Sequence, residues 1–134
     1  MKKRLTRQEV PKDLTWNLTD IFPSDETWET ALQEVLEALS TVTSYQERLN
    51  EGATVFFDCL EALEALSKEF TKVAGYAYLK QATDGTDPAN QAMLGRSSAA
   101  GAQFAAQTAF VRSEALALPD GTLERYLKEE PRLK

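Results

Sequence analysis

The 134-residue sequence contains no histidine and one cysteine, and these absences exclude more function classes than any residue that is present. Without histidine the chain cannot form a Ser-His-Asp or Cys-His catalytic group, a histidine-bearing zinc site, or the Glu-x-x-His ligands of a di-iron bundle. Glycine-rich phosphate loops are also missing. Within these residues we therefore expect no catalytic residue, no bound cofactor and no metal ligand.

Long apolar runs are absent as well. No stretch approaches the roughly 18 to 20 residues that a membrane span needs, and the basic start, residues 1–12, lacks the apolar core of a secretory signal. A single cysteine cannot form an internal disulfide, which fits a reducing compartment. We expect a cytoplasmic protein without a membrane partner.

Charge is distributed unevenly along the chain. Residues 1–12 contain five basic residues and one acidic residue, whereas residues 13–69 contain thirteen acidic and two basic residues. Nucleic-acid binding needs a basic surface that replaces counterions. The acidic middle of the chain therefore argues against a nucleic-acid partner.

The spacing of apolar residues predicts an all-α fold, with an extended arm over residues 1–23 and a helical domain over residues 24–134. We expect an elongated antiparallel bundle of three long helices and the start of a fourth. The expected helices cover residues 25–50, 54–83, 88–118 and 122–130. In the first two, apolar residues recur every three or four positions, which places them on one face.

Capping residues set the expected helix ends. Ser24 is predicted to be the N-cap of the first helix and Gly52 its C-cap. Asp87 and Pro88 are predicted to open the third helix, and Thr122 to cap the last.

The third helix differs from the others because alanine, glycine and serine dominate its body. Gly95 and Gly101 each disfavour a helix by about 1 kcal/mol, so a close-packing reason is expected for both. Small residues all round indicate a helix that is buried on more than one side.

The arm is too apolar for a free tail, and we expect its large side chains to pack on the helices that follow. These side chains are Trp16, Leu18, Ile21 and Phe22.

Several residues invite a functional interpretation, but a structural role is favoured for each. Cys59 lies in the apolar seam of the second helix and is expected to be a buried thiol. The carboxylates are expected to face solvent or form turns, the tyrosines to pack, and the arm residues to anchor the arm. These residues are Asp58, Glu61, Glu64, Asp84, Asp87, Tyr76, Tyr78, Tyr126, Thr15, Trp16 and Asn17.

Residues 16–24, which read Trp-Asn-Leu-Thr-Asp-Ile-Phe-Pro-Ser, and the later Trp28 resemble the start of oligoendopeptidase F. Residues 86–90 and 123–133 resemble the N-terminal helical region of the same family of zinc metallopeptidases. The resemblance implies an almost wholly helical enzyme of several hundred residues that cuts short peptides. It also implies zinc held by a His-Glu-x-x-His helix and a later Glu, none of which lies in this sequence.

On this resemblance we expect the chain to be a non-catalytic segment that forms part of the wall of a peptide channel. Its partners would be the remainder of the peptidase chain and the oligopeptide substrate. The alternative is a stand-alone helical adaptor that binds a partner helix along an exposed seam. A carboxylate-bridged metal bundle is nearly excluded because its Glu-x-x-His motif cannot exist here.

Overall fold

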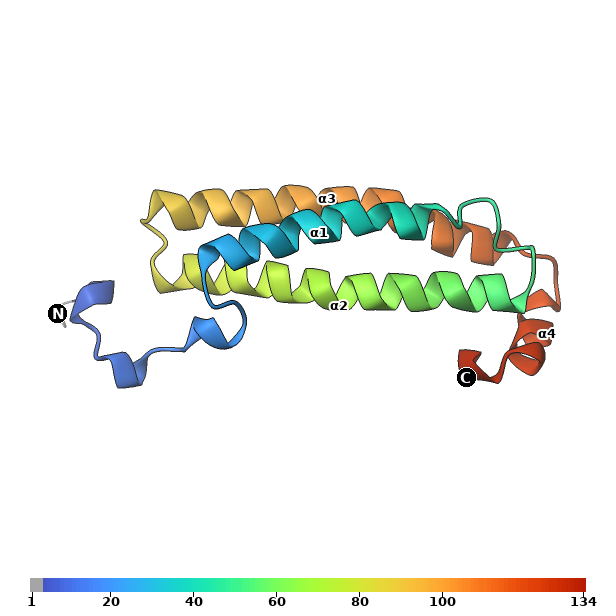
Figure 1. Ribbon diagram of the computed structural model, residues 1–134, viewed down its shortest axis with the longest axis horizontal. Coiled ribbons are helices and arrows are strands. Elements are labelled where there is room, and N and C mark those ends of the chain that lie inside the picture. The colour runs from blue at the N-terminus through green and yellow to red at the C-terminus, as the bar shows by residue number, and fades with distance from the viewer. Residues whose placement is uncertain (1–3) are drawn as a thin grey trace.

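The computed structural model describes residues 4–134, which form helices and turns but no strand. The helices are α1 (Asp25–Thr43), α2 (Ala53–Thr83), α3 (Pro88–Ala117) and α4 (Thr122–Glu129). The first three lie side by side with alternating direction, and the short α4 turns back beneath one end of the bundle (Figure 1). The predicted all-α elongated antiparallel bundle is confirmed.

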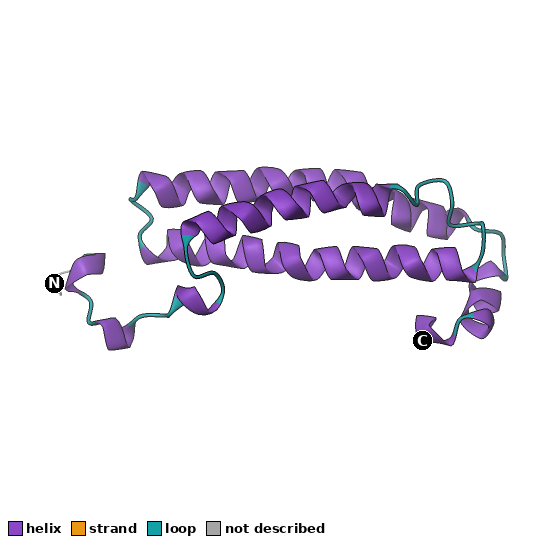
Figure 2. Ribbon diagram, in the orientation of Figure 1, coloured by secondary structure: helices purple, strands orange, loops and turns teal. Residues whose placement is uncertain are grey.

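The arm precedes the bundle and consists of short 3₁₀ turns joined by loops (Figure 2). The turns of the arm are Arg7–Glu9, Lys12–Leu14 and Leu18–Asp20, and a fourth turn, Pro131–Leu133, follows α4. The arm lies at the end of the bundle where α1 begins and α2 ends (Figure 1).

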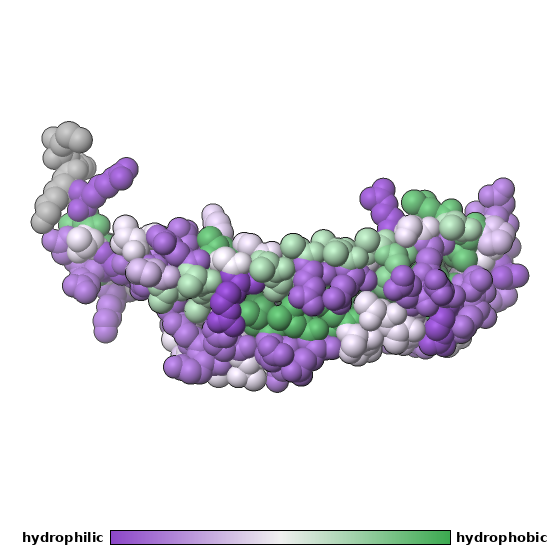
Figure 3. All heavy atoms as spheres, turned by 90° about the horizontal axis from the view of Figure 1, so that it is seen from above, coloured by the Kyte–Doolittle hydropathy of each residue, from purple (hydrophilic) through white to green (hydrophobic). Residues whose placement is uncertain are grey.

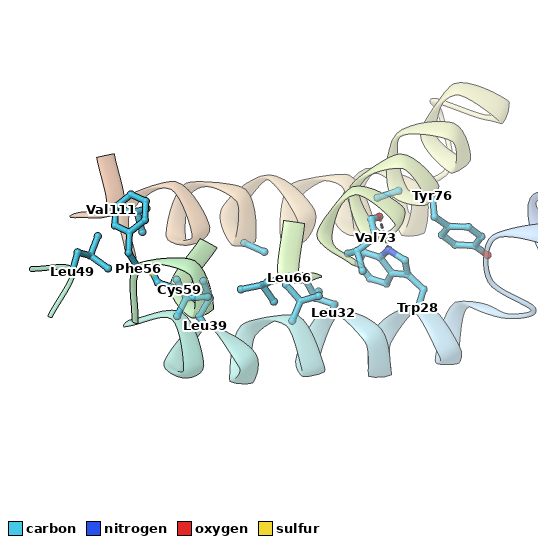
Figure 4. Close-up of a cluster of buried hydrophobic side chains, with 14 of the residues drawn as sticks. Trp28, Leu32, Leu39, Leu49, Phe56, Cys59, Leu66, Val73, Tyr76 and Val111 are labelled. Atoms are coloured by element: carbon cyan, nitrogen blue, oxygen red, sulfur yellow. Dashed lines mark hydrogen bonds between the residues drawn. The ribbon is translucent and has the colours of Figure 1, made fainter. Parts of the chain in front are cut away.

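The core runs along the inside of the bundle and follows the predicted apolar seams (Figure 4). From α1 and α2 it includes Trp28, Leu32, Val35, Leu39, Val42, Phe56, Cys59, Leu66, Val73 and Ala77, all buried. Trp28 has no exposed surface, and its indole N–H donates to the Val73 carbonyl at 2.8 Å. This bond satisfies the polar atom of the indole inside an apolar core.

α1 ends at Thr43, so the prediction that it continues to about residue 50 is wrong. The hydroxyls of Thr43 and Ser44 donate to carbonyls three residues earlier, which gives the backbone an alternative to further helix. In the next turn the Glu114 carboxylate accepts the Glu47 N–H at 2.6 Å. Leu49 is buried nonetheless, because the turn places it against the core.

Two of the predicted helix ends lie at other residues because glycines with positive φ values are the N-caps there. Gly52, with φ 156°, is the N-cap of α2 rather than the C-cap of α1. Gly121, with φ 81°, caps α4, and Thr122 is the first residue of that helix. Both φ values favour glycine. Ser24 and Asp87 are N-caps as predicted, because each side chain accepts a backbone N–H from the first turn of its helix.

Within the described residues, α3 is buried along one side only, against expectation. Gly101 lies there, and a Cβ at this position would come 3.3 Å from the Phe70 ring, which confirms close packing. At Gly95 a Cβ would meet nothing within 4 Å, so the described residues supply no close-packing reason for that glycine. The exposed small residues of the opposite side include Ala92, Gly95, Ala99, Ala102, Ala106 and Ala109. Figure 3, which looks onto this side of the molecule, shows an apolar band with hydrophilic residues around it.

Candidate functional site

Cys59 is a buried thiol, as predicted. Burial raises its pKa to about 11, and the negative charge of Glu114 adds to this effect. Since the thiolate is the reactive form, Cys59 is inert near neutral pH.

The carboxylates of α2 do not form a metal site. Glu61 and Glu64 are exposed, and the Glu64 carboxylate lies 2.7 Å from the Lys68 ammonium. The hydrogen bond and positive charge of Lys68 lower the pKa of Glu64. Asp58 is half-buried on the same helix. Among residues 4–134 no three His, Cys, Asp or Glu side chains gather where they could hold a metal ion.

Asp84 and Asp87 shape the turn between α2 and α3. The Asp84 carboxylate accepts the Thr86 N–H and hydroxyl at 3.0 and 2.7 Å. Asp87 caps α3 by accepting the Ala89 N–H at 2.8 Å. The predicted turn and cap roles are therefore confirmed.

Two of the three candidate tyrosines pack, and one does not. Tyr126 is buried next to Phe56, and its hydroxyl donates to the Leu49 carbonyl at 3.2 Å. Tyr76 is buried as well, whereas Tyr78 is 63% exposed, so a packing role is wrong for Tyr78.

Asp25, Tyr76 and Lys80 form a polar cluster where α1 begins and α2 ends. The Tyr76 hydroxyl donates to Asp25 at 2.7 Å, and the Lys80 ammonium donates to the same carboxylate at 3.2 Å. Burial acts to raise the pKa of Asp25, but the hydrogen bonds and the charge of Lys80 outweigh it and lower the pKa. Burial, together with the Asp25 hydrogen bond, raises the pKa of Tyr76 to about 12.

This cluster joins the two helices and was missed by sequence reasoning. Asp25 and Tyr76 are 51 positions apart in the sequence, so no local spacing pattern connects them. Because these polar groups bond one another, the cluster has a structural role.

The arm is only partly anchored. Leu18, Ile21 and Phe22 pack against the core, and the Phe22 and Tyr76 rings meet edge to face at 5.4 Å. Trp16 is 82% exposed, so the prediction that it packs on the helices is wrong.

Two adjoining hollows lie between the arm and the end of α2. The more apolar one has a volume of about 310 Å³ and lies between arm residues, including Trp16, and Leu79 of α2. The more polar one has a volume of about 510 Å³ and includes Lys80 and Asp25 in its lining. Arg7 and Trp16 line both hollows. We call the pair the arm groove, and its opening contains the most exposed aromatic side chain among the described residues.

The sequence and the structure of the chain were compared with those of known proteins. No protein-family model matches the chain. Oligoendopeptidase F of Lactococcus lactis subsp. cremoris is 31% identical over 130 residues, and oligopeptidase PepF of Bacillus subtilis is 27% identical over 128 residues. The crystal structure of oligoendopeptidase-F from Enterococcus faecium matches with a TM-score of 0.74 and 26% identity over 82% of this chain.

The chain is related to oligoendopeptidase F. The similarity extends over 96% of its residues, which confirms the resemblance indicated by residues 16–24. The chain spans only 19% of the length of B. subtilis oligopeptidase PepF and 22% of the length of L. lactis oligoendopeptidase F. Among residues 4–134 no helix is both long and apolar enough to cross a membrane.

Proposed function

We propose that the chain is the N-terminal helical segment of a zinc metallopeptidase that hydrolyses short peptides in the cytoplasm. The observation that carries this proposal is the structural match to the E. faecium enzyme, at a TM-score of 0.74. The sequence relatives, which are named as oligopeptidases and oligoendopeptidases, support the same activity. Hydrolysis belongs to the whole enzyme in this proposal, and the segment itself is non-catalytic.

The residues of this chain do not fit a zinc site. Catalytic zinc is held by three protein ligands, usually including histidine, with one position open to water. The chain has no histidine, its one cysteine is buried in the core, and residues 4–134 gather no alternative ligand set. We therefore propose that zinc is bound by residues outside these 134, and no catalytic step is assigned to this chain.

We assign this segment to the wall of the peptide channel, where it positions substrate by excluding bulk. A wall needs rigid packing rather than reactive groups, and the buried seams of α1 and α2 supply such packing. The exposed side of α3 supports contact with more protein. There Ala92, Gly95, Ala99, Ala102 and Ala106 repeat every three or four residues, a spacing that lets another helix approach closely.

A cleavage assay tests this proposal in a longer protein that contains this sequence. Purified protein is assayed for cleavage of a short fluorogenic peptide, before and after removal of metal by a chelator and after zinc is added back. Cleavage that is lost and then restored supports the proposal, with no cleavage expected for residues 1–134 alone. The adaptor alternative would be favoured if the reading frame contained no His-Glu-x-x-His motif and the purified protein did not cleave the peptide.

The wall role has its own test, which uses an introduced thiol. Ala106→Cys places a cysteine on the exposed side of α3, while the native Cys59 stays silent because it is buried. We expect a thiol reagent to label Ala106→Cys readily in the isolated chain and at least about tenfold more slowly in the longer protein, since packed sites react only through opening. Equal labelling in both would contradict packing of this side.

A further inference from the structure

The arm groove exposes large apolar side chains that the described residues leave uncovered. Trp16 is 82% exposed, Leu14 73% and Leu5 59%. All three line the apolar hollow of about 310 Å³, together with Leu79 and Ala82 of α2. Single exposed apolar residues are ordinary, but a group of them around a hollow marks an interaction surface.

The other half of the arm groove is polar, and its lining includes an arginine that forms no ion pair among residues 4–134. Lys80 is already paired with Asp25 at 3.1 Å. Arg7 lines both hollows and forms no ion pair among residues 4–134. The Thr86 hydrogen bonds, and to a smaller extent the positive charge of Arg7, lower the pKa of the Asp84 carboxylate. The groove therefore combines an apolar hollow, an exposed indole and an available guanidinium.

These features define the chemistry of an occupant. A large apolar side chain fits the hollow beside Trp16, and a neighbouring carboxylate can receive the paired N–H groups of Arg7. The occupant is thus a polypeptide segment that carries a large apolar residue next to an acidic one.

Chain length identifies the source of that segment. The chain spans about a fifth of the length of its relatives, 19% of one and 22% of another, so such proteins hold several times more polypeptide than these residues. A continuously exposed cluster of tryptophan and leucine is an aggregation liability, which favours permanent cover over a transient ligand.

We propose that the arm groove docks a segment of the same polypeptide from outside residues 1–134, with an apolar side chain against Trp16 and a carboxylate on Arg7. This inference rests on the proposed function, because it requires a longer protein. It goes further by naming the docking residues and the chemistry of the segment that they bind.

Tryptophan fluorescence tests the docking directly. The chain has two tryptophans, and the difference between the spectra of wild type and Trp16→Phe isolates the emission of Trp16 without altering the buried Trp28. In the isolated chain we expect emission typical of water-exposed indole and strong quenching by acrylamide. In the longer protein we expect blue-shifted emission and quenching reduced about fivefold, as the exposed fraction falls from 82% to a buried value.

A matched pair of arginine variants tests the ionic half of the groove. Arg7→Gln removes the guanidinium that lines it, whereas Arg4→Gln removes an exposed arginine of the arm that does not. We expect Arg7→Gln to restore acrylamide quenching of Trp16 in the longer protein at least in part, and Arg4→Gln to leave the protection unchanged.

Three outcomes would overturn the docking proposal. One is equal quenching of Trp16 in the isolated chain and the longer protein, and another is equal behaviour of Arg7→Gln and Arg4→Gln. The third is protection in the isolated chain that grows with its concentration, which would identify a second copy as the occupant. Peptide cleavage is measured on the same samples, so a peptidase with an exposed Trp16 would refute the docking and leave the proposed function standing.

Discussion

The two tryptophans contrast the bundle with the arm. Trp28 has no exposed surface, its indole N–H is bonded to the Val73 carbonyl, and the Arg96 guanidinium lies 5.6 Å from its ring. Trp16 is 82% exposed and borders a hollow. The same residue type is thus part of the core in one region and exposed apolar surface in the other.

The difference follows from how each region is built. In the bundle, residues spaced three and four apart converge from three long helices and bury one another. In the arm, 3₁₀ turns of three residues present no continuous face, so of residues 4–23 only Leu18, Ile21 and Phe22 reach the core. Among the described residues, the arm therefore leaves the large side chains of Leu5, Leu14 and Trp16 exposed.

The largest expected effect comes from removing the buried tryptophan. Trp28→Ala should lower the free energy of unfolding by about 3 to 5 kcal/mol, because it leaves a cavity and removes the hydrogen bond from the indole to the Val73 carbonyl. Chemical denaturation of the isolated chain followed by circular dichroism measures this loss. A loss below about 1 kcal/mol would contradict a tightly packed core around this indole.

A smaller effect is expected where the arm joins the bundle. Tyr76→Phe removes the hydrogen bond to Asp25 and should lower the free energy of unfolding by about 1 to 2 kcal/mol. Tyr78→Phe, two residues along the same helix, is the matched control because Tyr78 is largely exposed. Equal stability of the two variants would show that the polar cluster does not join α1 to α2.

The same tyrosine predicts a dependence on pH. Its pKa is raised in the fold from an ordinary value of 10.0 to about 12. The unfolded chain therefore releases this proton first as the pH rises, and the stabilisation present below pH 10.0 is lost between there and about pH 12. Unfolding curves should show the difference between wild type and Tyr76→Phe shrinking over this range. A constant difference would contradict the raised pKa.

The bundle was largely predictable from the sequence because apolar spacing and capping residues are patterns among residues close in the sequence. Apolar spacing identified the core of α1 and α2, and Ser24 and Asp87 identified two helix starts. The end of α1 was not predictable in this way. Besides the Thr43 and Ser44 hydroxyls, it involves the Glu114 carboxylate, which comes from another helix to accept the Glu47 N–H in the following turn.

The arm groove was harder to predict because it depends on long-range placement. Apolar composition correctly indicated that the arm has contacts, yet it could not distinguish Phe22, which packs, from Trp16, which does not. The hollow arises where the arm meets α2, whose Leu79 lies 63 positions beyond Trp16 in the sequence. No spacing rule connects residues so far apart.

Gly95 and Gly101 of α3 differ in their surroundings, because Gly101 faces the Phe70 ring and Gly95 has nothing within 4 Å. Gly95→Ala should raise the free energy of unfolding of the isolated chain by about 0.5 to 1 kcal/mol, because alanine favours helix and the new methyl group meets nothing within 4 Å. Gly101→Ala should raise the free energy of unfolding by less than this, or lower it, since its methyl group would lie 3.3 Å from the Phe70 ring. Thermal unfolding of both variants measures the difference. An equal gain would show that Phe70 moves aside without cost.

The smallest effect is expected at the exposed tryptophan. Trp16→Ala should change the free energy of unfolding of the isolated chain by less than about 0.5 kcal/mol, as is usual for surface positions. It should also reduce the binding of a hydrophobic dye, since Trp16 lines the apolar hollow. A loss of several kcal/mol would mean that the indole already packs in this chain, and the contrast with Trp28 would disappear. Unchanged stability with weaker dye binding would mean that this side chain contributes to a surface rather than to a core.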